Sequence, residues 1–442
     1  MSKKKKNVPT SKIVRMGKLF GATSYIVAKE LSGRIKEKVK KQSIVQKLEQ
    51  KQKQAAQIVK TLSELRGAAL KAGQMLSLEL SDFLPPEVTK ILNKMHDQVY
   101  FMDIDKVEKI LHNELGDDGR ALLKNFDEEP FAAASIGQVH KATYKGQNIV
   151  IKIQYPKIGK SIKSDIQSIE KLITVFMKGT GKKIDFGDIY KELESNFRKE
   201  IDYKKEAAAL IKYKDLFKEH KYFTVPSPII EISSKRILAM EEMQGIKLTE
   251  YIESKKYDPV FFGNAILKLL FLEFFEFGIV QTDPNPGNFL VDPKRKKLIL
   301  LDLGSHKKYS KKTRKNVTEL LKVTLAGDKD AIINKAYQLE LLEAHEEPEV
   351  KELFFKMMRQ ITMIFDPQHQ PFNFSDENYL ADIRRLSLEF VRAVKYSKPS
   401  KELIFLNRKL GGMFHILKQG NIEMNVSDYW DKIDQANMNK SP

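Results

Sequence analysis

Two segments in the second half of the chain decide the fold: Gln281-Thr-Asp-Pro-Asn-Pro-Gly-Asn-Phe-Leu290 and Leu300-Leu-Asp-Leu-Gly304. The first is a polar turn with an acid, Asp283, and an amide, Asn288, and it leads into a short apolar run. The second places an acid, Asp302, at the end of another apolar run. A purely structural turn between two strands is the alternative, but it would leave this order of Asp, Asn and Asp to chance.

This order of side chains suits phosphoryl transfer, which needs a Lys on the phosphates, an acid that orients the Lys, and oxygen ligands for Mg²⁺. Asp302 and Asn288 would hold Mg²⁺, and Asp283 would position or deprotonate the acceptor. Lys152 alternates with apolar residues on a predicted strand, and Glu206 on a later predicted helix would pair with it. A single Lys in a strand is usually part of an exposed face, so Lys152 depends on its companions.

Apolar periodicity outlines the rest of the fold. We predict strands at 131–144 with an internal turn, 149–153, 222–225, 236–241, 289–291 and 298–301. We predict helices at 58–80, 87–96, 161–217, 261–277 and over most of the chain from 312. The order of strands, helix, strands, linker and helices is that of the small and large lobes of a kinase, so we predict an α+β, bilobal protein-kinase-like fold.

Changes in composition divide the chain into four parts. We predict a basic helix within residues 1–34, a helical extension at 35–125, a small lobe with inserted helices at 126–243, and a mostly helical large lobe at 244–442. The first helix is amphipathic, so it would either lie on anionic lipid or pack on the body of the protein.

The composition narrows the classes of partner and compartment. The net charge is +19, which suits an anionic membrane, nucleic acid or a solvated lysine-rich surface. The basic residues form no recognisable reading module, so we predict no nucleic-acid partner. The absence of cysteine excludes disulfides and thiolate metal sites. We find neither a signal peptide nor a membrane-spanning run, and therefore predict a cytoplasmic protein with peripheral contact on the inner face of a membrane.

Two features depart from an ordinary protein kinase. No G-x-G-x-x-G covers the phosphates, and an alanine-rich segment stands in its place. Leu70-Lys-Ala-Gly-Gln-Met75 places a glycine inside a predicted helix, at a cost of about 1 kcal/mol. The residues that we assign to nucleotide binding, besides Lys152, are Ala132, Ala133, Ala134, Ser135, Ile136, Glu241 and Met243.

Both departures resemble the UbiB family of atypical kinases, also called the AarF or ADCK family. The likeness covers residues 60–307 and is carried by Lys71-x-Gly73-Gln74, Ser135-Ile-Gly-Gln-Val-His140, Glu200-x-Asp202 and Asp283-Pro-Asn-Pro-Gly-Asn288. Gln281 stands where many bacterial members have His, and in this the chain resembles the mitochondrial branch. Asp302-Leu-Gly304 replaces the usual Asp-Phe-Gly and keeps the metal-binding acid.

The resemblance implies a lid over the mouth of the active site, formed by Lys71 and Gln74, with Lys71 facing Glu200 and Asp202 and protein substrates excluded. It also implies ATP hydrolysis with Mg²⁺ in support of ubiquinone or other quinone and isoprenoid-lipid metabolism. The implied partners are ATP, anionic or quinone-related lipid, and enzymes of lipid biosynthesis. A phosphotransferase acting on a small molecule or a protein, and a pseudokinase scaffold that binds nucleotide, are the alternatives.

Overall fold

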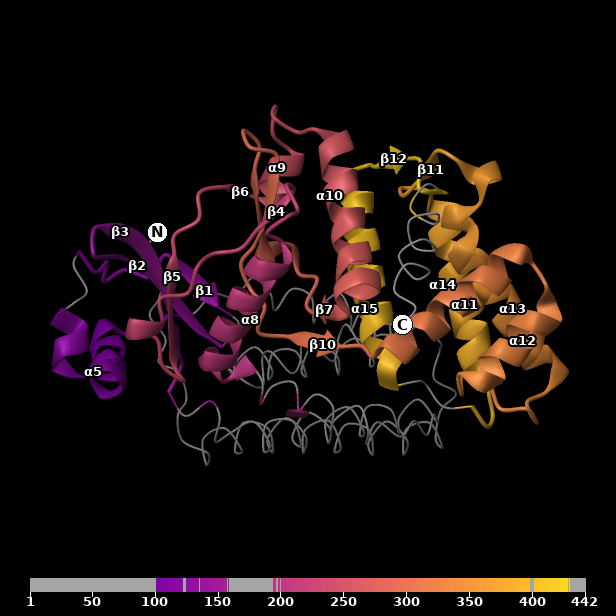
Figure 1. Ribbon diagram of the computed structural model, residues 1–442, viewed down its shortest axis with the longest axis horizontal. Helices are drawn as coiled ribbons and strands as arrows, with labels where there is room; N and C mark the ends of the chain where they lie inside the picture. Colours follow the sequence, from indigo (N-terminus) through magenta and orange to yellow (C-terminus); the bar gives the residue numbers. More distant parts are fainter. Residues whose placement is uncertain are drawn as a thin grey trace, which may run out of the picture. The chain divides into compact units, whose positions relative to one another are not determined.

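The computed structural model describes residues 101–121, 125–134, 136–156, 158, 194–195, 198, 200–397, 401–427 and 429. The predicted basic helix 1–34, the lid residues Lys71 and Gln74, and Ser135 lie outside these residues. The chain divides into two compact units, shown in Figure 1. The first comprises Met1–Ile211 and Pro226–Glu242, and the second Lys212–Val225 and Met243–Pro442.

The first unit contains a four-stranded antiparallel sheet in the order β1-β2-β3-β5. Its strands are β1 (Ala132–Ala134), β2 (Gly137–Tyr144), β3 (Gln147–Gln154) and β5 (Ile237–Glu241). Lys145 and Gly146 join β2 to β3 with positive φ angles of 48° and 81°, the geometry of a tight hairpin turn. The predicted strand pair is therefore confirmed.

Helix α5 (Ile104–Ala121) covers part of this sheet (Figure 1). Val107, Ile110 and Leu111 recur at helical spacing, and they share one buried cluster with alternate residues of β3 such as Ile151. The short helix η2 (Ile230–Ile232) adds Ile232 to the same cluster. The core of the first unit thus lies between helical residues and one face of the sheet.

The second unit contains three small sheets. The largest has the order β4-β9-β8-β6, and its strands are β4 (Phe223–Thr224), β9 (Lys297–Leu300), β8 (Phe289–Asp292) and β6 (Ile246–Lys247). Two-stranded sheets pair β7 (Ile279–Gln281) with β10 (His306–Lys308), and β11 (Phe372–Asn373) with β12 (Glu423–Met424). The predicted strands at 222–225, 289–291 and 298–301 are confirmed, whereas β6, β7, β10, β11 and β12 were not predicted.

The remainder of the second unit is helical, as predicted from residue 312 onward. Its α-helices, besides the end of α8 (Tyr203–Leu216), are α9 (Leu248–Ile252), α10 (Pro259–Phe271), α11 (Lys311–Ala326), α12 (Lys329–Gln338), α13 (Pro348–Thr362), α14 (Glu377–Ala393) and α15 (Lys401–Gln419). Short 3-10 segments are η4 (Pro286–Asn288), η5 (Met363–Phe365) and η6 (Pro367–His369). None of the helices in the described residues has the length and hydropathy of a membrane span.

The predicted helix 261–277 is two segments instead of one. Asp258 caps α10 by accepting from the Phe261 amide at 2.9 Å, and Pro259 occupies the first turn. The helix then continues as the π-helical segment η3 (Leu272–Phe277), and Gly278 ends it with φ of 64°. The hydrophobic pattern does not reveal this change of helix type.

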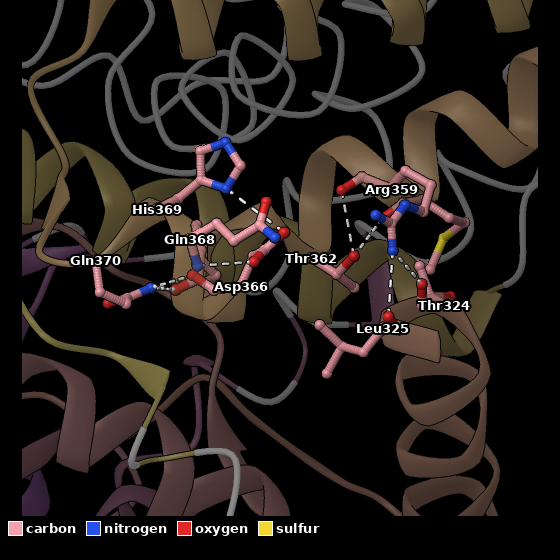
Figure 2. Close-up of polar contacts among 10 residues, drawn as sticks. Thr324, Leu325, Arg359, Thr362, Asp366, Gln368, His369 and Gln370 are labelled. Atoms are coloured by element: carbon pink, nitrogen blue, oxygen red, sulfur yellow. Dashed lines mark hydrogen bonds and ion pairs between the residues drawn. The ribbon is translucent and has the colours of Figure 1, made fainter. Parts of the chain in front are cut away.

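A cavity of about 960 Å³ lies among α11, α13, α14 and η5. Figure 2 shows Arg359 of α13 at its wall, where Nη1 donates to the carbonyl oxygens of Thr324 and Leu325 at 2.8 and 3.3 Å. A guanidinium at the end of α11 satisfies carbonyls that lack a partner within the helix. None of the predicted site residues lines this cavity.

Candidate functional site

Lys152 and Glu206 form a buried ion pair in the first unit. Lys152 lies in β3, where Val139 of β2 and Leu238 of β5 are its neighbours across the sheet. Its Nζ is 2.5 Å from Oε1 of Glu206, and the two residues are only 6% and 3% exposed. Two charges this deeply buried need each other, because each is costly to remove from water alone. The structure therefore brings together the Lys and the acid that the sequence nominated.

Asp202 helps to place Glu206. Its carboxylate accepts from the Lys204 amide at 3.2 Å and its carbonyl from the Lys205 amide at 2.9 Å, so it caps the start of α8. Glu206 then falls in the first turn of that helix. Glu200, 8% exposed, lies just before the cap. The predicted contact of Glu200 and Asp202 with Lys71 remains a prediction, because Lys71 is outside the described residues.

The alanine-rich segment forms a strand. Ala132, Ala133 and Ala134 make up β1 and pair with β2, and Ile136 is buried. Residues 132–134 of the predicted phosphate-covering loop are therefore strand, and Ser135 lies outside the described residues. A Cβ atom on Gly137 would lie 2.2 Å from the carbonyl oxygen of Ile153, so only glycine allows the two strands to approach this closely.

Gln138 and His140 in the same motif anchor the sheet. Gln138 Oε1 accepts from the Met102 amide at 2.6 Å, and its Nε2 lies 2.8 Å from His140 Nε2. His140 Nδ1 is 2.8 Å from the carbonyl oxygen of Asp127. Burial lowers the pKa of His140, which favours the neutral ring with Nδ1–H donating to that carbonyl. The contacts of these two side chains are structural.

Glu241 and Met243, assigned to nucleotide binding, lie at the end of β5 and just beyond it. The carboxylate of Glu241 accepts from the hydroxyl and the amide of Ser227 at 3.0 and 3.3 Å. Its neighbour Glu242 pairs with Lys141 at 2.6 Å. The roles of Glu241 and Met243 toward a nucleotide remain predictions.

The three polar residues of the second unit lie at the ends of short strands. Asp283 follows β7, Asn288 ends η4 immediately before β8, and Asp302 follows β9. Because β8 and β9 are antiparallel, with Phe289 opposite Leu300, Asn288 comes next to Leu301. The Leu301 amide donates to the Asn288 carbonyl at 2.9 Å. Asn288 therefore lies opposite the residue that immediately precedes Asp302.

The donor atoms at this strand end fit a magnesium ion. Asn288 Nδ2 donates to the Asp283 carbonyl at 3.1 Å, which leaves Oδ1 as the amide atom for a metal. Asp302 accepts from the Gly304 amide through Oδ1 at 3.0 Å. Mg²⁺ usually takes one or two protein oxygens together with phosphates and water, so one amide and one carboxylate suffice. In the described part of the chain, no cluster of three or more acidic or His side chains is placed to hold a metal ion.

Three charged residues behind this strand end were not predicted. Lys409 of α15 is fully buried, with Nζ 2.8 Å from Oε2 of Glu273 and 3.1 Å from Oε1 of Gln281. Arg408 lies 3.9 Å from Oδ1 of Asp283. Burial raises the pKa of Glu273, and the nearby Lys409 acts in the opposite direction. An acid inside the most apolar run of the sequence was the available signal for this cluster.

Comparison with known proteins identifies the family. A family model described as the ABC1 atypical kinase-like domain matches residues 94–336. The "Atypical kinase coq-8, mitochondrial" of Caenorhabditis elegans is 31% identical over 424 residues, covering 92% of this chain and 55% of that protein. The "Atypical kinase COQ8B, mitochondrial" of Rattus norvegicus is 32% identical and is covered to 68%, with 81% of this chain aligned. The chain thus spans about half the length of the worm relative.

A solved structure supports the kinase-like fold. The Rv3197–erythromycin complex from Mycobacterium tuberculosis superimposes with a TM-score of 0.61, covering 86% of this chain and 95% of that protein at 23% identity. At this identity the likeness concerns the fold. The family model covers more than half of the chain, and the relatives align over most of it. The chain therefore belongs to the ABC1 atypical kinase-like family, the UbiB family that its motifs resemble.

Proposed function

We propose that the protein binds ATP with Mg²⁺, hydrolyses it, and supports ubiquinone or another quinone or isoprenoid-lipid pathway at a membrane surface. Membership of a kinase-like family implies the use of ATP. The observation that carries the proposal is the Lys152–Glu206 ion pair at 2.5 Å, in a chain that also presents Asp283, Asn288 and Asp302 at strand ends. A buried Lys with its own acid is what phosphate binding requires.

Each of these residues has a role in the proposal. Lys152 would neutralise the phosphates, and Glu206 would keep its ammonium group in place. Asn288 and Asp302 would hold Mg²⁺ through side-chain oxygens, and the metal would neutralise charge on the phosphates. Asp283 would orient or deprotonate the attacking group.

The lipid part of the proposal has separate support. Both relatives carry the name COQ8 and are named mitochondrial, and the formal charge of +19 favours an anionic surface. We therefore include peripheral membrane contact and anionic or quinone-related lipid as partners. Deleting residues 1–34 should abolish co-sedimentation with anionic vesicles, and unchanged binding would contradict a membrane role for that segment.

Ligand-dependent stability tests the nucleotide site. Mg²⁺ and ATP at about 100 times the dissociation constant should add about 2.7 kcal/mol to the free energy of unfolding of the parent protein. Asp302→Asn should lose most of this gain. Asp330→Asn, at an exposed position in the first turn of α12, should keep it. No stabilisation in any of the three proteins would refute nucleotide binding.

Product analysis then separates the reactions. Single-turnover assays with labelled ATP, with and without anionic vesicles, should release inorganic phosphate from the parent protein. Label on an added lipid or protein would favour a phosphotransferase. Stabilisation by nucleotide without any phosphate release would leave only a nucleotide-binding scaffold.

A further inference from the structure

Helix α15 lies beyond the matched family region, yet it contacts the turn that carries Asp283. The family model ends at residue 336, and α15 spans Lys401–Gln419. A Cβ atom on Gly412 would lie 2.2 Å from Cγ of Pro284, so only glycine lets the helix backbone approach this closely. Figure 1 shows α15 running beside α10 in the second unit. The close approach places the charged residues of α15 next to residues 283–288, which we call the DPNPGN turn.

Lys409 reaches this turn through a buried network. It is 0% exposed, as is Glu273, and the two side chains are 2.8 Å apart. Oε1 of Glu273 also accepts from the Gln281 amide at 3.2 Å and from the Tyr213 hydroxyl at 3.1 Å. A charge pair held this firmly is costly to break, because either partner alone would remain as a buried charge. Glu273 therefore connects Lys409 to the backbone just before the turn.

Gln281 carries the connection forward. Its Oε1 accepts from Lys409 at 3.1 Å. Its Nε2 donates to the carbonyl of Asp283 at 2.6 Å and to that of Asp302 at 3.3 Å. One amide side chain thus touches α15 and the backbone at both predicted acids.

We propose that α15 positions the DPNPGN turn, with Lys409 acting as a positioning residue through Glu273 and Gln281. Arg408, 3.9 Å from the Asp283 carboxylate, reinforces the placement from the preceding position of the same helix. The effect of this arrangement on catalysis rests on the proposed function. The mechanical claim, that α15 holds the DPNPGN turn in place, does not depend on it. The two are therefore tested by separate measurements.

Amide hydrogen exchange on the full chain tests the mechanical claim. Lys409→Met keeps the length of the side chain and removes its charge, while Gln281→Met keeps the ion pair and removes the amide. The matched control is Lys418→Met, because Lys418 lies on the same helix and pairs with Glu377, which is 80% exposed. Peptides covering residues 281–288 should exchange at least about tenfold faster in Lys409→Met than in the control, relative to α13. The protected amides include Thr282, which donates to Ser305 at 2.9 Å.

The pattern of exchange decides the proposal. Faster exchange confined to the turn and its neighbours supports it. Exchange equal to that of Lys418→Met, or raised to the same extent in α13, would overturn it, because the ion pair would then serve global stability alone. If Lys409→Met does not fold, Gln281→Met provides the same comparison with the buried charges still paired.

Kinetics on the same samples test the catalytic meaning. Per folded molecule, Lys409→Met should lower kcat about tenfold and change the KM for ATP less than about threefold, because Lys152 and Glu206 are unaltered. A parent protein that releases no phosphate would contradict the proposed function. The hydrogen-exchange comparison would still test whether α15 positions the turn, because it does not depend on activity.

Discussion

Breaking the Lys152–Glu206 ion pair should destabilise the protein far more than breaking an exposed ion pair in the same unit. In Lys152→Met, the methionine fills most of the space of the lysine, but Glu206 loses its counter-charge at a position that is 3% exposed. At 2.5 Å and an effective dielectric constant of about 20, the attraction between unit charges is about 7 kcal/mol. The cost of removing both ions from water offsets part of it, so we expect a loss of about 3–5 kcal/mol.

Equilibrium urea unfolding of five proteins measures this loss: the parent, Lys152→Met, Glu206→Met, the double variant and a control. The control is Lys145→Met, which breaks an ion pair with Glu231 in which both side chains are more than 60% exposed, so it should cost much less than Lys152→Met. The double variant Lys152→Met/Glu206→Met removes both charges. Its loss of unfolding free energy should therefore be smaller, by about 2–3 kcal/mol, than the sum of the losses in the two single variants. A loss in Lys152→Met no larger than the control, or a double variant equal to the sum of its singles, would refute the reasoning.

Three further predictions concern backbone packing and pH. Gly137→Ala should lower the free energy of unfolding by at least about 2 kcal/mol, because its Cβ would meet a carbonyl oxygen at 2.2 Å. Gly411→Ala should instead stabilise α15 by about 0.5–1 kcal/mol, because nothing lies within 4 Å of the added Cβ. Thermal unfolding measures both variants. Equal changes in the melting temperature of Gly137→Ala and Gly411→Ala would contradict the packing. Burial opposes the ionised Glu346, but hydrogen bonds from residues 395–397 lower its pKa to about 2. Its stabilising contribution should therefore be present above about pH 4.5 and fall as the pH approaches 2. Glu346→Gln should remove this pH dependence in urea titrations, and an unchanged pH profile would exclude the carboxylate as its source.

Most of the elements that were predicted correctly have enough residues to show their pattern, and the two-residue strand β4 is the exception. β2 and β3 each have eight residues on either side of a Lys-Gly turn, and β3 contains the apolar run 149–153, so both strands and their pairing were predictable. β10 has three residues and β11 and β12 have two each, too few for alternation to stand out. β7 continues from the apolar run before it, so nothing in the pattern separated it from the helix.

The part of the candidate site that could be predicted is the part whose residues belong to short sequence motifs. Asp283, Asn288 and Asp302 lie within one stretch of the sequence. The structure places Asn288 and Asp302 at the ends of β8 and β9, which the sequence predicted, and Asp283 after β7, which it did not predict. Lys409 could not be found this way, because a lysine in an amphipathic helix normally faces solvent and its partner Gln281 is 128 residues distant.

The number of residues in the π-helical segment η3 determines the direction in which Glu273 points. A π-helix closes its hydrogen bonds one residue later than an α-helix, so it holds one extra residue relative to regular helix. Each residue of an α-helix turns the chain by about 100°, so losing one residue from Leu272–Phe277 would rotate Glu273 away from either α10 or the strand that follows. We expect relatives with a one-residue gap in this segment also to lack a basic residue at the position of Lys409. Alignment of this short stretch would thus report on a contact made more than a hundred residues later in the chain.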